Sequence, residues 1–336
     1  MRKVEYWKSI CILFAGLLLF SYATAIEAAD YRIRVANPVA ADHSWGRGAV
    51  VFKQELEKLS GGKIAVEVHH VSALGKVRET MEMVRMGTLE TCLGGVANFQ
   101  RNVPELGITV LPFLWKDIKT MYNVLEGAPG QELNKKMLGA GFVNLGFWDN
   151  GFRHVSNSRK PIQTMDDLKG LKIRTLPTPV HIAFFKALGA APTPMDWAEL
   201  FEGLRSGVVD AQENPPSMTY TARFYEVQKY YSLTGHVNEV GAFIMNKAFY
   251  EKLPKDLKAA VDQAARKTTA WQWEENDKDN QKYLKDLEKA GMKVNALAPA
   301  EIEKFRKIAH QGYPDAIKDF GKDGKKLTDM FVAANK

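Results

Sequence analysis

Three short stretches near the middle of the chain carry residue types that could hold an anion. Lys172-Ile173-Arg174 is followed further along by Gln212-Glu213-Asn214-Pro215, and Gly151-Phe152-Arg153 lies upstream of both. A strand with Ile173 on one side turns Arg174 to the other, where a half-buried guanidinium needs a carboxylate or phosphate partner. No acidic residue stands beside Arg174 in the sequence, so two interpretations remain open. Arg174 binds an external anion, or it pairs with a distant Asp or Glu, as buried charges normally do.

Alternating apolar residues predict the strands that position these stretches. The patterns fall at residues 31–35, 64–68, 142–148, 171–175 and 208–211. Between the first two strands, a helix with Ser44 as its expected cap carries Phe52, Leu56 and Leu59 on one face. The opening of the chain is therefore a β-α-β unit.

The order of these elements predicts an α/β fold with largely parallel sheets and helices on both faces, because helix-length segments separate the strands. In such sheets, ligands bind beyond the carboxyl ends of the strands. Arg174 and the expected loop 212–214 both fall at such ends. This placement favours the anion site over a purely structural arginine.

A further helix is expected to begin beside this site. Asp196 can cap its first turn, Glu199 can reach back to complete a capping box, and Gly207 can end the helix. Trp197 would then occupy the first helical position. Its ring either packs into the core or covers the apolar part of a ligand.

A long helix is predicted over residues 254–291, because the chain between Pro254 and Gly291 contains neither proline nor glycine and is rich in helix formers. Such a helix would be about 50 Å long at about 1.5 Å per residue. It could brace two lobes with a ligand cleft between them. A coiled coil is the alternative, but the apolar residues do not keep a heptad repeat.

The amino terminus has the pattern of a cleavable export signal. Arg2, Lys3 and Lys8 precede an apolar stretch from Ile10 to Tyr22, and Ala23-Thr24-Ala25 supplies the small residues that a signal peptidase reads. The stretch falls short of the roughly 20 apolar residues of a membrane-spanning helix, which argues against an anchor. We expect residues 1–25 to be removed and the mature protein to be periplasmic.

The mature chain would keep a single cysteine and a mild positive charge. Cys92 cannot form an internal disulfide alone, so stability must come from the core that roughly 310 residues can build. The formal net charge of +7 falls to about +5 without the signal, and lysines are interspersed with acidic residues, as on solvated helices. This pattern is not a basic stripe, and we expect no nucleic-acid partner.

The sequence contains no motif typical of an enzyme. A nucleophile elbow, a zinc-protease helix and a complete phosphate loop are all missing. His69 and His70 would point to opposite faces of a strand and could not share a metal. Glu213 is the one carboxylate near the expected cleft that could act as a base. We predict no catalytic residue, metal or cofactor, and a secreted enzyme acting on a carboxylic acid is kept as an alternative.

Several longer motifs occur together along the mature chain. They are Leu74-Gly75 with Arg78-Glu79, Leu111-Pro112-Phe113, Gly151-Phe152-Arg153, residues 167–174, Ala187-Leu188-Gly189-Ala190 with Pro192-Thr193-Pro194-Met195, and residues 207–215. In this combination the chain resembles the DctP-type solute-binding subunits of tripartite ATP-independent periplasmic (TRAP) transporters. The resemblance implies a two-lobed periplasmic binding protein with a fold like that of type II periplasmic binding proteins. Such a protein closes on an organic acid and delivers it to an ion-gradient-driven permease.

The resemblance also implies roles for individual residues. Arg174 would form a bidentate bond with the ligand carboxylate, Asn214 would add a hydrogen bond, Arg153 would support the anionic end, and Trp197 would be the cleft aromatic. Planar guanidinium and carboxylate groups suit this geometry. The pocket would be completed from the amino-terminal lobe by Asn37, His43, Arg78 and Asn98, although Arg78 could instead pair with Glu82 one helical turn away.

The expected ligand follows from a departure within the family pattern. Sialic-acid-binding members carry a glutamate and an arginine in the stretch that corresponds to residues 95–99, where this chain has Gly95 and Asn98. Sialic acid is therefore not expected. A C4-dicarboxylate such as succinate, malate or fumarate is favoured, and a hexuronate or another carboxylic acid is the alternative.

We expect two lobes that each combine separate parts of the chain. Residues 26–150 with 239–275 would form lobe I, and residues 151–238 with 276–336 would form lobe II, with the helix at about 254–291 spanning both. The protein is expected to be a monomer whose partners are the carboxylate ligand and the TRAP permease subunits. Presentation of the ligand to a periplasmic sensor is an alternative that the residues leave open.

Overall fold

The computed structural model describes residues 29–335, so the expected signal peptide, residues 1–25, lies outside the described residues. Its strands are β1 (Tyr31–Ala36), β2 (Ile64–His69), β3 (Thr91–Gly95), β4 (Phe142–Asn157), β5 (Lys172–Thr175), β6 (Ala191–Pro194), β7 (Ala211–Asn214), β8 (Tyr230–Asn246) and β9 (Lys293–Ala296).

Helices surround these strands. The α-helices are α2 (Ser44–Leu59), α3 (Val77–Met86), α4 (Ile118–Glu126), α5 (Ala128–Gly139), α6 (Pro179–Ala187), α7 (Leu200–Arg205), α8 (Pro216–Thr221), α9 (Lys247–Lys252), α10 (Lys255–Lys289), α11 (Pro299–Lys318) and α12 (Gly324–Ala334). The short 3-10 helices are η1 (Val96–Phe99), η2 (Pro104–Val110), η3 (Met165–Leu168), η4 (Trp197–Glu199) and η5 (Phe224–Glu226). Between residues 29 and 335, no helix is both long enough and apolar enough to cross a membrane.

All strands belong to one nine-stranded sheet with the order β2-β1-β3-β8-β4-β7-β5-β6, and β9 pairs with β8. The pairs β1–β2, β1–β3, β5–β6, β5–β7 and β8–β9 are parallel, whereas β3–β8, β4–β8 and β4–β7 are antiparallel. The predicted α/β class with mostly parallel pairing is confirmed. The antiparallel pairs all involve β4 or β8, the two long central strands.

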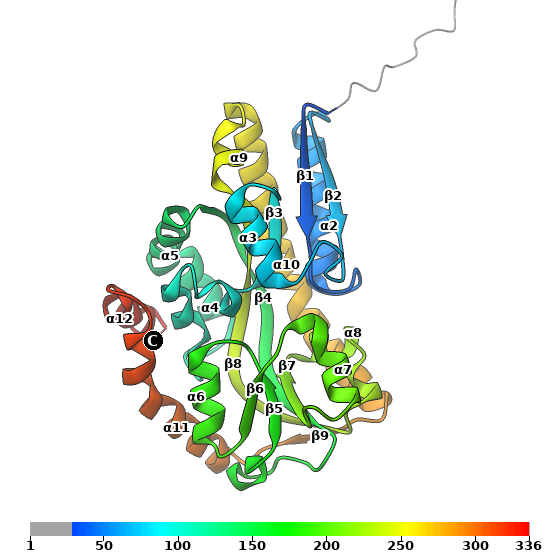
Figure 1. The fold of residues 1–336 in the computed structure, drawn as a ribbon, viewed down its shortest axis with the longest axis vertical. Coiled ribbons are helices and arrows are strands. Elements are labelled where there is room, and N and C mark those ends of the chain that lie inside the picture. The colour runs from blue at the N-terminus through cyan, green and yellow to red at the C-terminus, as the bar shows by residue number, and fades with distance from the viewer. Residues whose placement is uncertain (1–28, 336) are drawn as a thin grey trace, which may run out of the picture.

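The elements gather in two lobes that β4 and β8 connect (Figure 1). The first lobe holds β1, β2 and β3 with α2, α3, α4 and α5, and the second holds β5, β6, β7 and β9 with α6, α7, α8 and α11. Separate apolar cores form in them, one around Phe52 and Phe243 and another around Ile173 and Phe185. The core around Phe52 also includes Met218 of α8, so it extends to the second lobe.

The helix α12 departs from the simplest division of the chain. Its buried Phe331 packs on Trp115, with 5.9 Å between the ring centroids. Phe331 also belongs to the same apolar core as Leu106 of η2. The chain end therefore returns to elements that lie within residues 26–150. The division into lobes at the boundaries given above stays a prediction.

The predicted β-α-β opening is confirmed, with one difference in the cap. β1 and β2 are parallel neighbours, and α2 runs between them in the chain. The cap is His43 and not Ser44, because the His43 side chain accepts the hydrogen bond from the Trp45 amide at 3.1 Å. Ser44 instead donates to Asn276 at 2.7 Å, which ties the start of α2 to α10.

The strand predicted at residues 208–211 was placed too early. Gly207 has φ of +75° and Val208 is 57% exposed, so this segment turns on the surface before β7 begins at Ala211. As a consequence, Gln212, Glu213 and Asn214 lie in a buried strand and not in a loop.

The pairing of β4 with β8 is irregular, and this changes which face of the sheet the β4 side chains point to. Its register shifts between Asp149 and Gly151 and again between Arg153 and Val155. A bulge of this kind re-aims side chains, because the extra residue breaks the alternation of faces. Asn150 and Arg153, which a regular strand would turn to opposite faces, line the same cavity.

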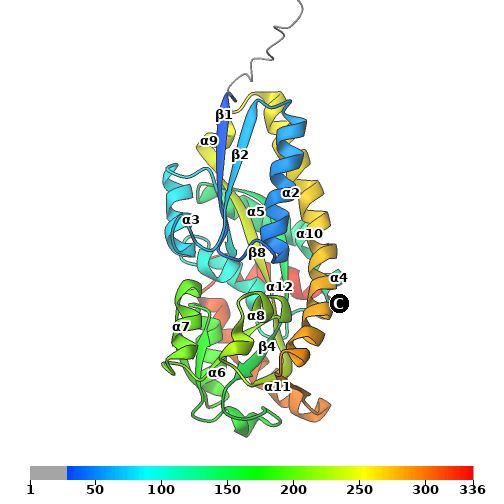
Figure 2. The ribbon, with the colours of Figure 1, turned by 90° about the vertical axis from the view of Figure 1, so that its right-hand side faces the viewer.

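The long helix is confirmed as α10, a 35-residue helix that passes along both lobes (Figure 2). In the first lobe, it packs Leu257 and Val261 into the apolar core beside α2. At its middle it carries polar residues to the bulge in β4. Gln272 accepts from the Asp149 amide and donates to the Asp149 carbonyl, both at 2.8 Å, and Asn276 donates to the Asp149 carboxylate at 2.7 Å. These bonds replace the ladder that the bulge interrupts, so α10 holds β4 where it passes between the lobes.

Replacing Gly151 with alanine is expected to destabilise the protein by about 1–3 kcal/mol. Gly151 has φ of +106°, and a Cβ atom there would lie 2.3 Å from the Asn280 Nδ2 atom. Denaturant unfolding measures the change. Gly139→Ala is the matched control, since Gly139 ends α5 and its Cβ would meet nothing within 4 Å. Equal stability of Gly151→Ala and the parent would show that the bulge is not strained as described.

Candidate functional site

A small cavity of about 40 Å³ lies between the two lobes. Among the predicted ligand-binding residues, those that line it are Arg174, Arg153, Asn214, Trp197 and Asn98. They come from β5, β4, β7, η4 and η1, so the fold brings together residues far apart in the chain. Five of the eight predicted site residues therefore meet at this cavity.

Arg174 is a buried cation with an unused donor. Its side chain is 2% exposed, and its Nε donates to the Met195 carbonyl at 2.9 Å. Its Nη1 atom is buried without a hydrogen-bond partner, and it forms no salt bridge with any residue between 29 and 335. Burial and the charge of Arg153 lower the pKa of Arg174 to about 10, which still leaves it charged at neutral pH. A guanidinium in this position lacks an anionic partner.

Arg153 is, by contrast, fully paired within its own chain. Its Nε lies 2.5 Å from Glu213 Oε2, its Nη2 lies 2.9 Å from Glu213 Oε1, and its Nη1 lies 2.6 Å from Glu239 Oε2. Burial opposes ionisation of Glu213, but Arg153 and a bond from His236 hold the pKa of Glu213 well below its usual range. The structural interpretation that the sequence left open for Arg174 therefore describes Arg153.

Asn214 and Trp197 line the same cavity as Arg174, all three from the second lobe. The side-chain amide of Asn214 on β7 donates one hydrogen to the Gln212 side chain, and the backbone carbonyl of Asn214 accepts from the Tyr231 hydroxyl at 2.9 Å. An amide has a second N–H hydrogen, which is available for a further acceptor. Trp197 packs on Phe224, with 5.5 Å between the ring centroids, and this contact fixes its ring at the cavity.

The helix start at Asp196 has the predicted cap, but its first turn is the 3-10 helix η4. The Asp196 side chain accepts from the Ala198 amide at 3.0 Å. The Glu199 carboxylate pairs with Lys76 of the first lobe at 2.6 Å, and this bond, together with one from the Asp196 amide, lowers the pKa of Glu199. Glu199 therefore links this helix start to the first lobe.

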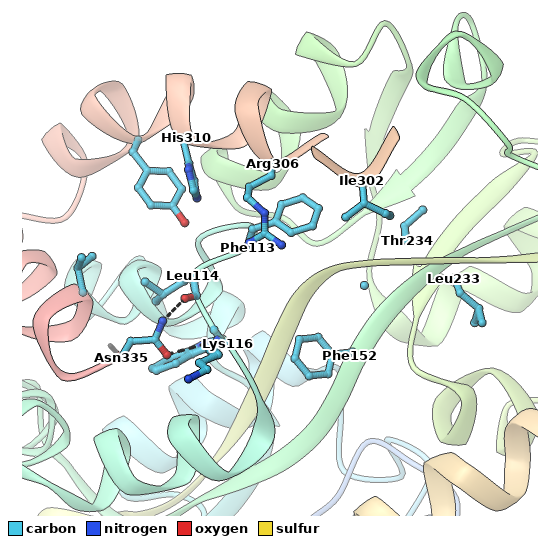
Figure 3. Close-up of a pocket in the computed structure, with 14 residues that line it drawn as sticks. Phe113, Leu114, Lys116, Phe152, Leu233, Thr234, Ile302, Arg306, His310 and Asn335 are labelled. Atoms are coloured by element: carbon cyan, nitrogen blue, oxygen red, sulfur yellow. Dashed lines mark hydrogen bonds between the residues drawn. The ribbon is translucent and has the colours of Figure 1, made fainter. Parts of the chain in front are cut away.

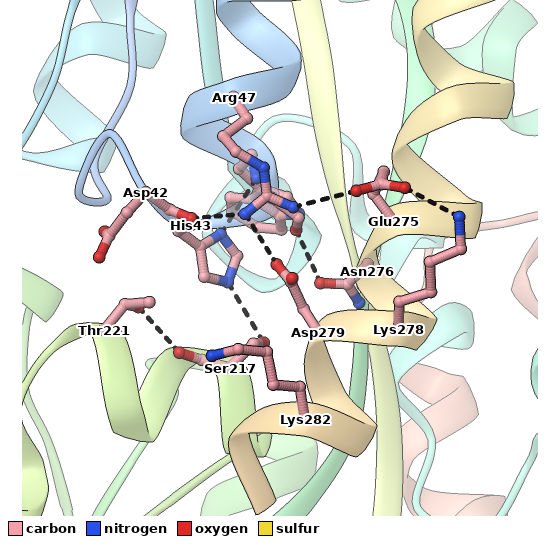
Figure 4. A network of polar contacts seen from close by, with 12 residues as sticks. Asp42, His43, Arg47, Ser217, Thr221, Glu275, Asn276, Lys278, Asp279 and Lys282 are labelled. Carbon is pink, nitrogen blue, oxygen red and sulfur yellow. Dashed lines mark hydrogen bonds and ion pairs between the residues drawn. The ribbon is translucent and has the colours of Figure 1, made fainter. Parts of the chain in front are cut away.

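Three predicted residues from the first lobe do not line the cavity. Asn37 donates to the Val39 carbonyl and contacts His70, both within its own lobe. Arg78 donates to the Pro177 carbonyl at 3.0 Å at the cleft mouth. His43 is fully buried in the polar network beside α10, with its Nε2 3.3 Å from the Ser217 hydroxyl (Figure 4).

The network around His43 joins the lobes on the α10 side of the cleft (Figure 4). Arg47 on α2 pairs with Asp279 at 3.1 Å and lies 3.5 Å from Glu275, both on α10. Burial and the nearby Arg47 charge lower the pKa of His43 to about 3, so His43 is neutral at physiological pH. A neutral imidazole there serves as cap and hydrogen-bond partner and adds no charge to the site.

Contacts across the cleft mouth hold the two lobes together. Lys76 pairs with Glu199, Arg78 reaches Pro177, and the Thr178 hydroxyl donates to Gln100 at 2.6 Å. Lys76 and Glu199 are about half exposed, so solvent screens their ion pair and it contributes little to stability. The structure is a closed form whose mouth contacts are individually weak, and such a form can reopen.

The cavity wall contains two residues with carboxylate or amide side chains that were not predicted from the sequence. Glu239 and Asn150 are 2% and 1% exposed, and the Asn150 Nδ2 atom lies 3.4 Å from Glu239 Oε2. The Glu239 Oε1 and Asn150 Oδ1 atoms are buried without hydrogen-bond partners. Burial raises the pKa of Glu239, and Arg153 offsets part of this increase. The sequence signal that could have indicated Glu239 is that it is the one acidic residue of β8.

A larger hollow of about 830 Å³ lies elsewhere, between α11, residues 113–116 and the bend of β8 (Figure 3). Its Arg306 already has partners. Arg306 stacks over Phe113, 5.0 Å from the ring centroid, and pairs with Glu303 at 3.1 Å. The other cation at this hollow, Lys116, is exposed to solvent, so the hollow offers no buried, unpaired charge like that of Arg174.

Comparisons with known proteins agree on one family. Residues 35–319 match the family described as bacterial extracellular solute-binding protein, family 7, also called DctP. A solute-binding protein of Verminephrobacter eiseniae is 40% identical over 315 residues, covering 90% of this chain and 94% of the relative. The chain therefore belongs to the DctP family of TRAP solute-binding proteins.

Solved structures of the family share the fold. The sugar acid binding protein DctPAm of Advenella mimigardefordensis, in complex with galactonate, has a TM-score of 0.87 at 33% identity and covers 90% of this chain and 98% of its own. A TRAP periplasmic solute-binding protein of Sulfurospirillum deleyianum with bound succinate has a TM-score of 0.85 at 34% identity, covering 90% and 99%. The family is one of transport proteins and not of enzymes.

Proposed function

We propose that this protein is the periplasmic binding subunit of a TRAP transporter that grips an organic acid by its carboxylate and delivers it, unaltered, to the membrane permease. The observation that supports this most is Arg174, a buried guanidinium with an unpartnered Nη1 atom at the cavity between the two lobes. A planar carboxylate can accept two parallel bonds from such a group.

The other wall residues support the same binding mode. The Asn214 amide can donate its second hydrogen to a ligand at the same cavity, and Trp197 offers an aromatic face for the ligand's carbon atoms. Arg153 has an indirect role, because the carboxylates of Glu213 and Glu239 already neutralise its charge. Its ion pairs fix the part of the cavity wall that holds Asn214 and Glu239. In this account, Arg153 supports the anion site without binding the ligand through a free charge.

Closure couples binding to conformation. When the lobes close, the ligand carboxylate and Arg174 lose water together, and each charge-assisted bond contributes roughly 1.5–3 kcal/mol. An acid that binds only between the lobes shifts the population toward the closed form. The permease would receive the acid when the weak contacts at the cleft mouth reopen.

The relatives bind acids that share this recognition group. DctPAm holds galactonate, and the Sulfurospirillum protein holds succinate. Both carry at least one carboxylate, and they differ in the rest of the molecule. The C4-dicarboxylate favoured by the sequence and a hexuronate are both members of the class that Arg174 can hold.

A thermal-shift screen of the purified protein tests this function. Mono- and dicarboxylates, uronates and keto acids are compared with neutral sugars at the same concentrations. An acid present at about 100 times its Kd should stabilise the folded state by roughly 2.7 kcal/mol, which raises Tm. Neutral sugars serve as the matched control. Stabilisation by neutral sugars and by no acid would contradict a carboxylate-binding role.

A further inference from the structure

The cavity wall contains two kinds of unused polar atom. The donor side is Arg174 with its unpartnered Nη1 atom. The other side consists of acceptors, Glu239 Oε1 and Asn150 Oδ1, both buried and both without partners among residues 29–335. Because the Asn150 Nδ2 atom faces Glu239 Oε2 at 3.4 Å, its carbonyl oxygen is the atom left over. A ligand that satisfies the whole wall must accept bonds at one end and donate them at the other.

Among the described residues, the cavity wall has no free cation that could pair with a second carboxylate of a ligand. Of the Lys and Arg residues that the structure describes, only Arg153 and Arg174 line the cavity. Arg153 is already held by the carboxylates of Glu213 and Glu239. Lys76 and Arg78 are engaged at the cleft mouth. A ligand with two carboxylates would therefore bury one of them without a counter-charge, which is costly.

A hydroxyl group fits the acceptor side. It can donate to a carboxylate or to an amide carbonyl, and it can also accept from a carboxylic acid, so it suits Glu239 in either protonation state. A carboxylate has no hydrogen to donate at neutral pH and cannot pair with the Asn150 carbonyl. Hydroxyl groups are thus the complementary chemistry for this half of the cavity.

Resting on the proposed function, we propose that the ligand is a polyhydroxy monocarboxylate, of the sugar-acid class, and that Glu239 and Asn150 select it over dicarboxylates by accepting bonds from its hydroxyl groups. This narrows the expectation from the sequence, which favoured a C4-dicarboxylate. Arg174 recognises the carboxylate of the ligand, and the acceptor pair, Glu239 and Asn150, discriminates between hydroxy acids and dicarboxylates. A site that hydrogen-bonds ligand hydroxyls rejects analogues that leave its buried polar atoms unpaired.

Calorimetry with two matched ligand series tests the selectivity. The four-carbon series is threonate, tartrate, succinate and butyrate, and the six-carbon series is gluconate, glucarate and hexanoate. We expect threonate or gluconate, in either enantiomer, to bind at least tenfold more tightly than every dicarboxylate and every unhydroxylated acid in its series. A dicarboxylate that binds as tightly would overturn the inference and leave the proposed function standing. No binding by any acid would overturn the proposed function itself.

Variants of the acceptor pair test its role separately. In Glu239→Gln and Asn150→Ala, the Kd of the hydroxy acid relative to that of the matching dicarboxylate is expected to rise at least tenfold. The ratio is measured within one protein, so a general loss of stability does not produce the effect. Glu202→Gln is the control, because Glu202 is exposed and pairs only with neighbouring Arg205. An unchanged ratio in both cavity variants would overturn the assignment of these residues.

Discussion

Replacing Arg174 with alanine is expected to weaken binding of the organic acid at least a hundredfold and to leave the fold intact. The substitution removes two charge-assisted hydrogen bonds worth roughly 1.5–3 kcal/mol each, and every 1.4 kcal/mol changes Kd about tenfold. We expect the native fold to tolerate the loss, because Arg174 forms no salt bridge with residues 29–335 and its Nη1 atom has no partner. Calorimetry gives the affinity and circular dichroism the fold.

Two further variants sharpen this prediction. Arg174→Lys should also lose most of the affinity, since an ammonium group cannot form two parallel bonds to a carboxylate. Arg205→Ala is the matched control and should bind like the parent, because Arg205 is exposed and pairs only with Glu202. If Arg174→Ala bound the acid as tightly as Arg205→Ala, Arg174 would not be the carboxylate-binding residue.

Replacing Arg153 with methionine is expected to have the opposite signature, a loss of about 3–5 kcal/mol in the free energy of unfolding. The change strands Glu213 and Glu239, which are 0% and 2% exposed and whose charges Arg153 balances. Denaturant unfolding measures the loss. Arg174→Met in the same assay should be as stable as the parent or more stable, since it removes a buried, unpaired charge.

The pair of variants separates two arginines that look alike in the sequence. Arg205→Ala again serves as the control and should change stability by less than about 0.5 kcal/mol, as most surface substitutions do. Equal stability losses in Arg153→Met and Arg174→Met would mean that both arginines are structural. In that case the cavity would lack the free cation on which the proposed function rests.

The elements with strong local patterns were predictable from the sequence. The β-α-β opening and α10 follow from apolar alternation and from a long run without proline or glycine, and the structure has both. The bulge at Asp149 and the exact start of β7 were not predictable, because long-range contacts determine them. Gln272 and Asn276 stabilise the bulge from a helix more than a hundred residues away in the chain.

The site was predictable to the extent that its residues are local. Arg174 follows from the alternation around Ile173, which the structure places in the core. The difference between Arg174 and Arg153 could not be predicted, since the partners of Arg153 lie 60 and 86 residues away in sequence. Asn37, His43 and Arg78 are polar residues near the cleft whose bonds to neighbouring groups, visible only in three dimensions, keep them off the cavity wall.

The central claim is that Arg174 holds the carboxylate of the ligand inside the cavity between the lobes. A crystal structure of the protein with its tightest-binding acid tests this most directly. We predict both carboxylate oxygens at about 2.7–2.9 Å from the Arg174 guanidinium nitrogens, in the plane of that group. A carboxylate bound elsewhere, such as beside Arg306 in the larger hollow, or an Arg174 paired with a carboxylate of its own chain, would contradict the account.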